Sequence, residues 1–140
     1  MSGILQGGAR RGVVAVIERD GCLLVIRRSQ HVVAPGALCF PGGAIQPGES
    51  EPVALIRELD EELGVAIQPL RQIWQSVTDW NVQISWWHAH LPPAEELHPC
   101  QAEVAAVYWM TIDDLHDHAD LLSSNLDFLQ GVRSGQIVLT

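Results

Sequence analysis

The stretch that decides the fold is residues 43–65, GAIQPGESEPVALIRELDEELGV. Within it, the apolar residues change from a period of two to a period of about 3.6, which is typical of an amphipathic helix. Ser50 is a suitable N-cap, and Pro52 suits the first turn of a helix. Gly64 is well placed to end the helix, so the sequence predicts a helix over residues 50–63.

One face of this expected helix carries the glutamates Glu58, Glu61 and Glu62, which are spaced i, i+3 and i+4. The apolar residues expected to enter the core lie nearly opposite: Ile56, Leu59 and Leu63. Like charges at this spacing destabilise a helix, and Arg57 can pair with Glu61 to offset only part of the repulsion. Two interpretations follow. Either this face of the helix is simply exposed to water, or its carboxylates bind divalent cations such as Mg²⁺, which prefer oxygen ligands.

The spacing from Gly43 to Val65 matches the pattern G-x5-E-x7-R-E-U-x-E-E-x-G-U, in which U is a bulky aliphatic residue. That pattern is the signature of the Nudix hydrolases, and the chain resembles a small MutT-like member of this family. Many members carry Glu at the position of Gln46. This position is not one of the defining ones, so the difference is expected to alter only contacts within the loop.

The resemblance implies a hydrolase that cleaves a diphosphate linkage with water and Mg²⁺ or Mn²⁺. The implied metal-binding groups are the carboxylates of Glu49, Glu58, Glu61 and Glu62 and the backbone carbonyl of Gly42. Glu49 would bind metal through water or orient the other ligands, and Arg57 would fix the rotamer of a glutamate.

Candidates for catalysis and for substrate binding include residues of the motif and residues outside it. The expected catalytic set is Glu61, Glu62, Arg57 and Glu103, the last because family members often carry a glutamate before a strand like 104–110. An ordinary surface loop is an equal alternative for Glu103. Arg27 and Arg28 are candidates for contact with a substrate phosphate, although a solvated hairpin end explains them as well.

The rest of the chain predicts a mixed α/β (α+β) domain. Asp20-Gly21 is a strong signal for a tight hairpin, which excludes a purely parallel sheet. The expected strands are 12–19, 22–28, 65–77, 80–91 and 104–110, with a short apolar run at 37–40 that breaks at Pro41-Gly42-Gly43. A short acidic helix is expected to open at Thr111, and a last helix over 125–133. Together with the resemblance, these elements predict one Nudix-type domain over residues 1–140, an α/β/α sandwich with a mixed sheet flanked by helices.

The amino-acid composition limits the kinds of molecule that the protein is expected to bind. The chain has 17 acidic and 8 basic residues and a net charge of −9, which argues against binding of nucleic acid. No apolar run approaches the ~20 residues that span a bilayer, and the first residues hold no stretch long enough for a secretory signal. The 3 cysteines form no C-x-x-C pair, so reduced thiols in a cytoplasmic protein are expected.

The expected substrate is a small nucleotide, most simply a (deoxy)nucleoside triphosphate, acted on by a monomer or a homodimer. The alternatives are another diphosphate, such as a nucleotide sugar, a dinucleoside polyphosphate or coenzyme A. A non-catalytic domain that senses nucleotides is the remaining alternative, but such domains typically lose the signature glutamates, which are all present here. Trp86 and Trp87 should face opposite sides of their strand, and sheet packing is preferred over base stacking for them.

Overall fold

A computed structural model describes residues 10–139 of the chain. Its elements in chain order are β1 (Arg10–Val16), β2 (Glu18–Arg19), β3 (Cys22–Arg28), β4 (Leu38–Cys39), β5 (Gly42–Ala44), α1 (Glu51–Leu63), β6 (Gln68–Val77), β7 (Val82–His90), β8 (Val104–Met110), α2 (Ile112–His116) and α3 (Ser123–Arg133). Residues 1–9, on which the expected absence of a secretory signal depends, lie outside this description. No helix among the described residues is both long and apolar enough to cross a membrane.

Two sheets form the centre of the molecule. The mixed sheet has the order β5-β1-β7-β6, in which β1 and β7 are parallel and the other neighbours are antiparallel. In the antiparallel sheet, β3 pairs with β2, β4 and β8. The prediction of a mixed sheet is confirmed, and a second sheet that is antiparallel throughout accompanies it.

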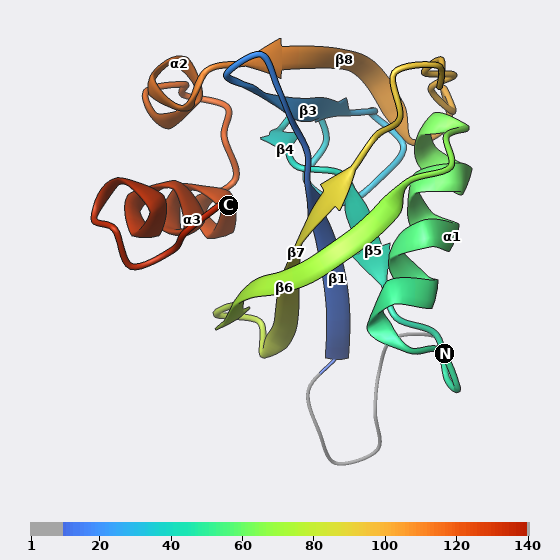
Figure 1. Cartoon of the computed structure of the whole chain (residues 1–140), viewed down its shortest axis with the longest axis horizontal. Helices are drawn as coiled ribbons and strands as arrows, with labels where there is room; N and C mark the ends of the chain where they lie inside the picture. Colours follow the sequence, from blue (N-terminus) through green and yellow to red (C-terminus); the bar gives the residue numbers. More distant parts are fainter. Residues whose placement is uncertain (1–9, 140) are drawn as a thin grey trace.

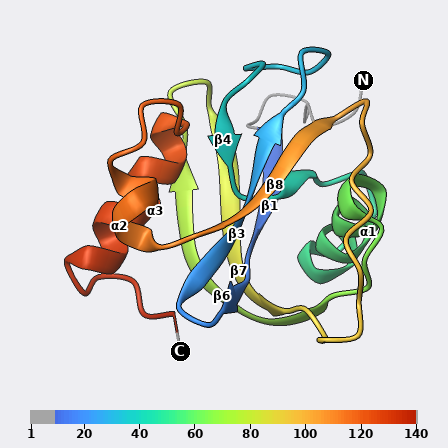
Figure 2. The same cartoon turned by 90° about the horizontal axis from the view of Figure 1, so that it is seen from above.

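The helices cover the sheets from two sides. Figure 1 and Figure 2 show α1 on one side of the strands and α2 with α3 on the other. One hydrophobic core, the α1 core, lies between α1 and the strands and includes Leu55, Leu59 and Leu63. The other, the α3 core, includes Phe128 and Leu129 of α3. This arrangement confirms the expected α/β/α sandwich.

The early hairpin forms as predicted, but the strand before it is divided. Asp20 and Gly21 both have positive φ, 53° and 80°, as a type I′ turn requires. The prediction of one continuous strand over residues 12–19 was wrong, because β1 ends at Val16 and β2 begins at Glu18. Between them, buried Ile17 accepts a hydrogen bond from the Leu24 N–H at 3.0 Å, so the chain leaves the mixed sheet for the antiparallel sheet there.

The helix predictions are confirmed with one shift. The Ser50 side chain accepts from the Val53 N–H at 3.3 Å, and Gly64 has φ 64°, so α1 is capped at both ends as expected. The last helix begins at Ser123, before the expected start at Asn125. Asn125 does not cap that helix, because its Oδ1 accepts from the backbone N–H of Phe40 at 2.9 Å.

The two adjacent tryptophans face opposite cores, as predicted. Trp86 is fully buried in the α3 core and stacks on Phe128, with the ring centroids 4.6 Å apart and the planes at 4°. Its Nε1 donates to the Ser76 hydroxyl at 3.0 Å. Trp87 packs partly buried against the α1 core. Both therefore serve packing between the sheets and the helices.

Replacing Trp86 with alanine should lower the free energy of unfolding by about 3–5 kcal/mol, since it removes a fully buried aromatic side chain. The matched control is Trp80→Ala, because Trp80 is 81% exposed and its loss should change stability by less than about 0.5 kcal/mol. Urea denaturation followed by circular dichroism measures both. Equal losses in the two variants would contradict the proposed stacking role.

Candidate functional site

Glu58 and Glu62 of α1 are more buried than the sequence predicts, whereas the side chain of Glu61 is half exposed. Glu62 is only 8% exposed, whereas Ile56, expected in the core, is 42% exposed. The expectation that the carboxylates lie opposite the buried face was therefore wrong for Glu62. The buried face of α1 is rotated, and its members are Ala54, Leu55, Leu59, Glu62 and Leu63.

Two glycines make room for these carboxylates. The expected break at Pro41-Gly42-Gly43 is in fact the short strand β5, which pairs with β1. A Cβ on Gly43 would overlap the Glu58 carboxyl group, and a Cβ on Gly42 would overlap the backbone oxygen of Val13. The Gly42 N–H donates to Glu62 Oε1 at 2.9 Å. The pair of glycines thus lets the backbone approach both α1 and β1 closely.

Arg57 is the central cation of the site. Its Nε and Nη2 donate to the two oxygens of Glu49 at 2.7 and 2.9 Å, a bidentate pair. Its Nη1 donates to Glu58 at 3.0 Å and to Glu61 at 3.2 Å. Its Nη2 also donates to the backbone oxygen of Ala44 at 2.9 Å. One guanidinium therefore ties the loop before α1 to two helix carboxylates, as the prediction that it fixes a glutamate requires.

Both carboxylate oxygens of the loop residue Glu49 accept hydrogen bonds. Besides Arg57, the backbone N–H of Gln46 donates to Glu49 Oε1 at 2.8 Å. The hydrogen bonds from Arg57, followed by the one from Gln46, hold the pKa of Glu49 below its ordinary value. The contact at Gln46 uses the backbone, so a glutamine at this position leaves the loop intact.

Burial and mutual repulsion set the charges of Glu58 and Glu62. Burial, reinforced by the negative charge of Glu58, raises the pKa of Glu62 to about 8, although the Gly42 N–H and the charge of Arg28 act in the opposite sense. Burial also raises the pKa of Glu58, against the lowering effect of Arg57. The charge of Glu103 makes a smaller contribution that also raises the pKa of both groups.

Backbone hydrogen bonds link Glu103 to the end of β3 and to the end of α1. Its carbonyl accepts from the Ser29 N–H at 2.9 Å, directly after β3, and its own N–H donates to Cys100 at 2.9 Å. The Cys100 N–H in turn bonds the backbone oxygen of Glu62 at 2.8 Å. Residues far apart in the sequence are thereby brought to the carboxyl-terminal end of α1.

The two arginines at the end of β3 diverge. Arg28 lies on the side of the carboxylates, where its Nη1 donates to Cys39 Sγ at 3.7 Å and its charge favours ionised Glu62. Arg27 lies on the other face of the strand, where it donates to Asp120 at 3.0 Å and covers the Tyr108 ring at 5.8 Å. Of the two candidates for substrate phosphate, the structure brings only Arg28 to the cluster.

Sequence reasoning missed Glu51, which anchors the start of α1. Its carboxylate accepts from Trp87 Nε1 at 2.8 Å, Gln72 Nε2 at 3.0 Å and Arg11 Nη2 at 3.2 Å. Burial raises the pKa of Glu51, but these donors outweigh burial and the pKa lies below its ordinary value. Its position in the first helical turn was the only sequence signal, and that signal suits any acidic cap.

The donor set suits a hard divalent cation. Among residues 10–139, no three His, Cys, Asp or Glu side chains already surround a common point. Arg57 and the Gly42 N–H instead hold the carboxylates. Their oxygens are nevertheless the ligands that Mg²⁺ and Mn²⁺ prefer, and burial is the main cause of the raised pKa values of Glu58 and Glu62, so a bound cation would favour their ionised forms.

The chain is similar in sequence to known proteins. A family model described as "NUDIX domain" matches residues 8–130. The Mycobacterium tuberculosis H37Rv protein named "Putative 8-oxo-dGTP diphosphatase 2" is 32% identical over 110 residues, which cover 75% of each chain. The Escherichia coli K12 protein named CTP pyrophosphohydrolase is 47% identical over 53 residues, covering 38% of this chain and 39% of that protein.

A solved structure supports the same likeness. The MutT NUDIX hydrolase from Burkholderia pseudomallei superimposes with a TM-score of 0.72 at 27% identity, covering 88% of this chain and 97% of that one. This chain spans less than half the length of two of the curated relatives that it matches, 39% and 48%.

The buried Glu62 should make stability depend on pH in the absence of divalent cations. Its pKa rises from the ordinary 4.5 to about 8 on folding, so its stabilising contribution is complete below pH 4.5 and is lost as the pH rises to about 8. Glu62→Gln should therefore gain stability relative to the unsubstituted protein over this interval. Urea denaturation in chelator measures the difference, with Asp127→Asn, at an exposed position of α3, as the control. A constant difference across the pH range would contradict the buried environment.

Proposed function

Because the chain belongs to the Nudix family, we propose that it is a pyrophosphohydrolase that uses Mg²⁺ or Mn²⁺ to cleave the diphosphate linkage of a (deoxy)nucleoside triphosphate. The observation that carries the proposal is the cluster formed by Glu58, Glu61 and Glu62 with Arg57 and Glu103. Three carboxylates, those of Glu49, Glu58 and Glu61, contact Arg57, and such an arrangement is costly to an isolated fold and suits a site that binds cations and an anionic substrate.

The residues divide the work according to their contacts. Glu58, Glu61 and Glu62 would hold the cation, with the Gly42 carbonyl as a further ligand. When bound, the divalent ion polarises phosphoryl oxygens and lowers the pKa of the attacking water. Arg57 would position Glu58 and Glu61, and because it contacts both Glu49 oxygens, Glu49 would orient the ligands.

Proton transfer and substrate contact fall to the remaining groups. The candidates to accept the proton of the attacking water are Glu61 and Glu62 of α1 and Glu103 from the loop before β8. Arg28 is the cation that faces the cluster, so it is assigned to a substrate phosphate. Arg27, paired with Asp120 on the far face of β3, is given no such role.

The names of the relatives support the substrate class. The mycobacterial and E. coli relatives are named for a modified deoxyguanosine triphosphate and for CTP. A substrate screen should therefore favour nucleoside triphosphates over nucleotide sugars, dinucleoside polyphosphates and coenzyme A. We also propose a cytoplasmic location, since Cys22, Cys39 and Cys100 are all unpaired thiols.

The decisive experiment identifies the bond that breaks. With a nucleoside triphosphate and Mg²⁺ in ¹⁸O-water, the products should be the monophosphate and pyrophosphate, with one labelled oxygen on the phosphorus that water attacked. Mass spectrometry locates the label. Glu61→Gln should reduce the rate by about 100-fold or more while the protein stays folded, and excess chelator should abolish turnover. Binding of nucleotide without any product across the screen would show a sensing domain instead.

Arg57→Lys tests the positioning role. Lysine retains the charge but cannot make the bidentate contact with Glu49, so kcat should fall by about 10- to 100-fold. The matched control is Arg133→Lys, the same change in an exposed ion pair with Asp113 on the other side of the molecule. Activity of Arg57→Lys equal to that control would mean that Arg57 supplies only charge balance.

A further inference from the structure

Ser29, the residue directly after β3, is a buried polar residue that joins two loops. It is only 4% exposed, although serine is mostly found at protein surfaces. Its hydroxyl donates to the Ala102 carbonyl at 2.8 Å and accepts from the His31 N–H at 3.1 Å. Its own N–H donates to the Glu103 carbonyl at 2.9 Å. Ser29 therefore binds two successive carbonyls of residues 98–103, which are called the Glu103 segment below.

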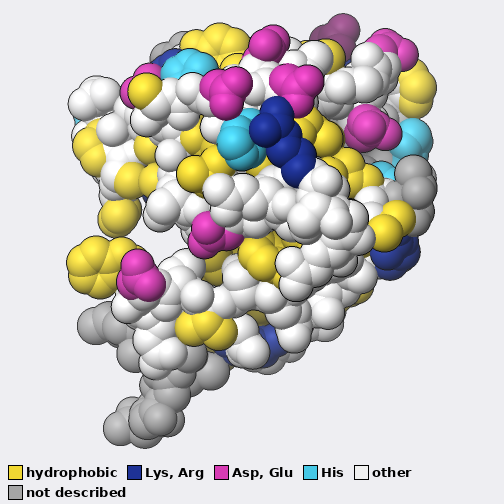
Figure 3. Space-filling view, turned by 90° about the vertical axis from the view of Figure 1, so that its left-hand side faces the viewer, with side chains coloured by type: hydrophobic (Ala, Val, Ile, Leu, Met, Phe, Trp, Pro, Cys, Tyr) yellow, Lys and Arg dark blue, Asp and Glu magenta, His cyan; other side chains and the backbone are white. Residues whose placement is uncertain are grey.

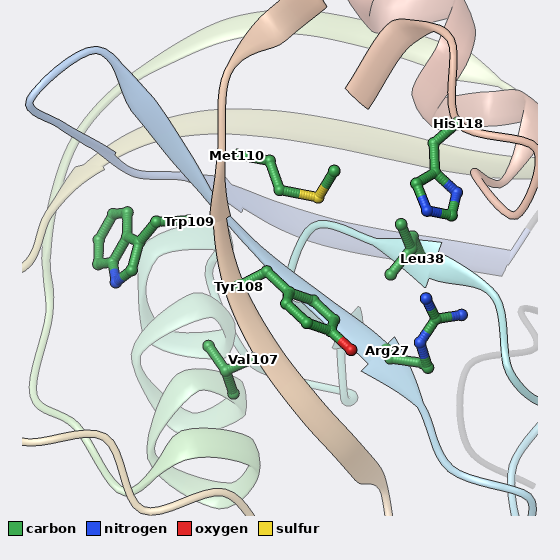
Figure 4. A pocket seen from close by; sticks show the side chains of 7 residues that line it. All are labelled: Arg27, Leu38, Val107, Tyr108, Trp109, Met110 and His118. Carbon is green, nitrogen blue, oxygen red and sulfur yellow. The ribbon is translucent and has the colours of Figure 1, made fainter. Parts of the chain in front are cut away.

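The pairing of β3 with β8 brings the Glu103 segment to Ser29. The two strands lie side by side and are antiparallel, so the end of β3 meets the start of β8 (Figure 4). The register shifts at this point, and Arg28 lies opposite Val104, which makes Ala105 the extra residue of a bulge. Bulges beside functional sites commonly redirect a neighbouring side chain. Here the bulge is followed at once by the backbone bond between Ser29 and Glu103.

The Glu103 carboxylate depends on the backbone of its segment for its position. It makes no hydrogen bond or ion pair with any of the described residues 10–139. Its charge nevertheless acts on Glu58 and Glu62 of α1. A carboxylate without contacts of its own can be held near such a cluster only by the contacts of the chain on either side of it.

The Glu103 segment is tied at both of its ends. At its start, the N–H groups of His98 and Cys100 donate to the carbonyls of Leu63 and Glu62, at 2.6 and 2.8 Å. At its other end, the ties are the bonds that Ser29 makes. A serine that served only its own turn would bond locally, as it does to the His31 amide, whereas the hydroxyl bond to the Ala102 carbonyl joins residues 73 positions apart.

We propose that Ser29 is a positioning residue for Glu103, because its hydroxyl holds the Glu103 segment against the end of β3, next to Arg28. The inference rests on the proposed function, in which Glu103 is a candidate to accept the proton of the attacking water. Such a group must lie within hydrogen-bond reach of that proton, and a small displacement costs much of the rate. Ser29 thus acts on the reaction through Glu103 and without touching the substrate.

Ser29→Ala should lower kcat for a nucleoside triphosphate with Mg²⁺ by about tenfold and leave KM unchanged, since Arg28 keeps its place. The matched control is Ser134→Ala. The Ser134 hydroxyl makes the same pair of contacts, donating to the Gly131 carbonyl at 3.1 Å and accepting from the Gln136 N–H at 3.4 Å. It lies at the end of α3, on the face that Figure 3 shows, so its loss should not change kcat.

A double-mutant cycle separates positioning from a general structural role. In a Glu103→Gln background, Ser29→Ala should reduce kcat by less than about twofold further, because Ser29 acts through Glu103. A tenfold loss in both backgrounds, or a loss confined to KM, would overturn the inference. So would Glu103→Gln with full activity, which would leave the proposed function standing. Absence of any turnover by the unsubstituted protein would instead contradict the proposed function itself.

Amide hydrogen exchange in chelator, without nucleotide, tests the same contact independently of activity. The amides of Glu103 and Val104, which both donate to the Cys100 carbonyl, should exchange at least about fivefold faster in Ser29→Ala. The amides in the middle of α1 should be unaffected, and Ser134→Ala should change neither set. Unchanged exchange at Glu103 and Val104 would overturn the inference. Faster exchange throughout the protein, α1 included, would overturn it equally, because it would show a loss of overall stability instead.

Discussion

The burial of carboxylates beside a hydrophobic core is the constraint on which the rest of the site depends. Glu58 and Glu62 are largely removed from water, and burial raises the pKa of each. Arg57 is the only guanidinium that contacts α1 carboxylates of this cluster among the described residues, and it also spans to Glu49. Arg57 therefore orders the cluster, and a divalent cation would favour the ionised forms of the two carboxylates that burial disfavours.

The sheets supply the space that the cluster needs. The chain crosses from the antiparallel sheet to the mixed sheet at Phe40 and Pro41, and Pro41 accepts from the Ala15 N–H at 2.9 Å. Directly after this crossing, Gly42 and Gly43 run between β1 and α1. Any side chain at these glycines would meet either the β1 backbone or the Glu58 carboxyl group. The same two residues therefore couple the packing of the sheet to the geometry of the site.

Anchors at both ends of α1 keep the carboxylates in place. Glu51 binds the first turn to strands β1, β6 and β7 through Arg11, Gln72 and Trp87. At the other end, the segment around Cys100 bonds the backbone of Glu62 and carries Glu103 to the cluster. The arrangement of the candidate site thus depends on contacts between segments that are distant in the sequence.

The sequence by itself determined what local chemistry controls. It identified α1 through the spacing of its apolar residues and its caps, the hairpin through Asp20-Gly21, and the family through the fixed spacing between Gly43 and Val65. Tertiary structure alone decided how deeply Glu62 is buried, that Arg28 rather than Arg27 faces the carboxylates, and that Glu51 anchors the helix. The physical reason is that the hydrogen bonds of helix caps and turns form between residues close in the sequence. The burial of a side chain, the direction in which it points and its interaction with other charges arise only when distant strands and helices pack together.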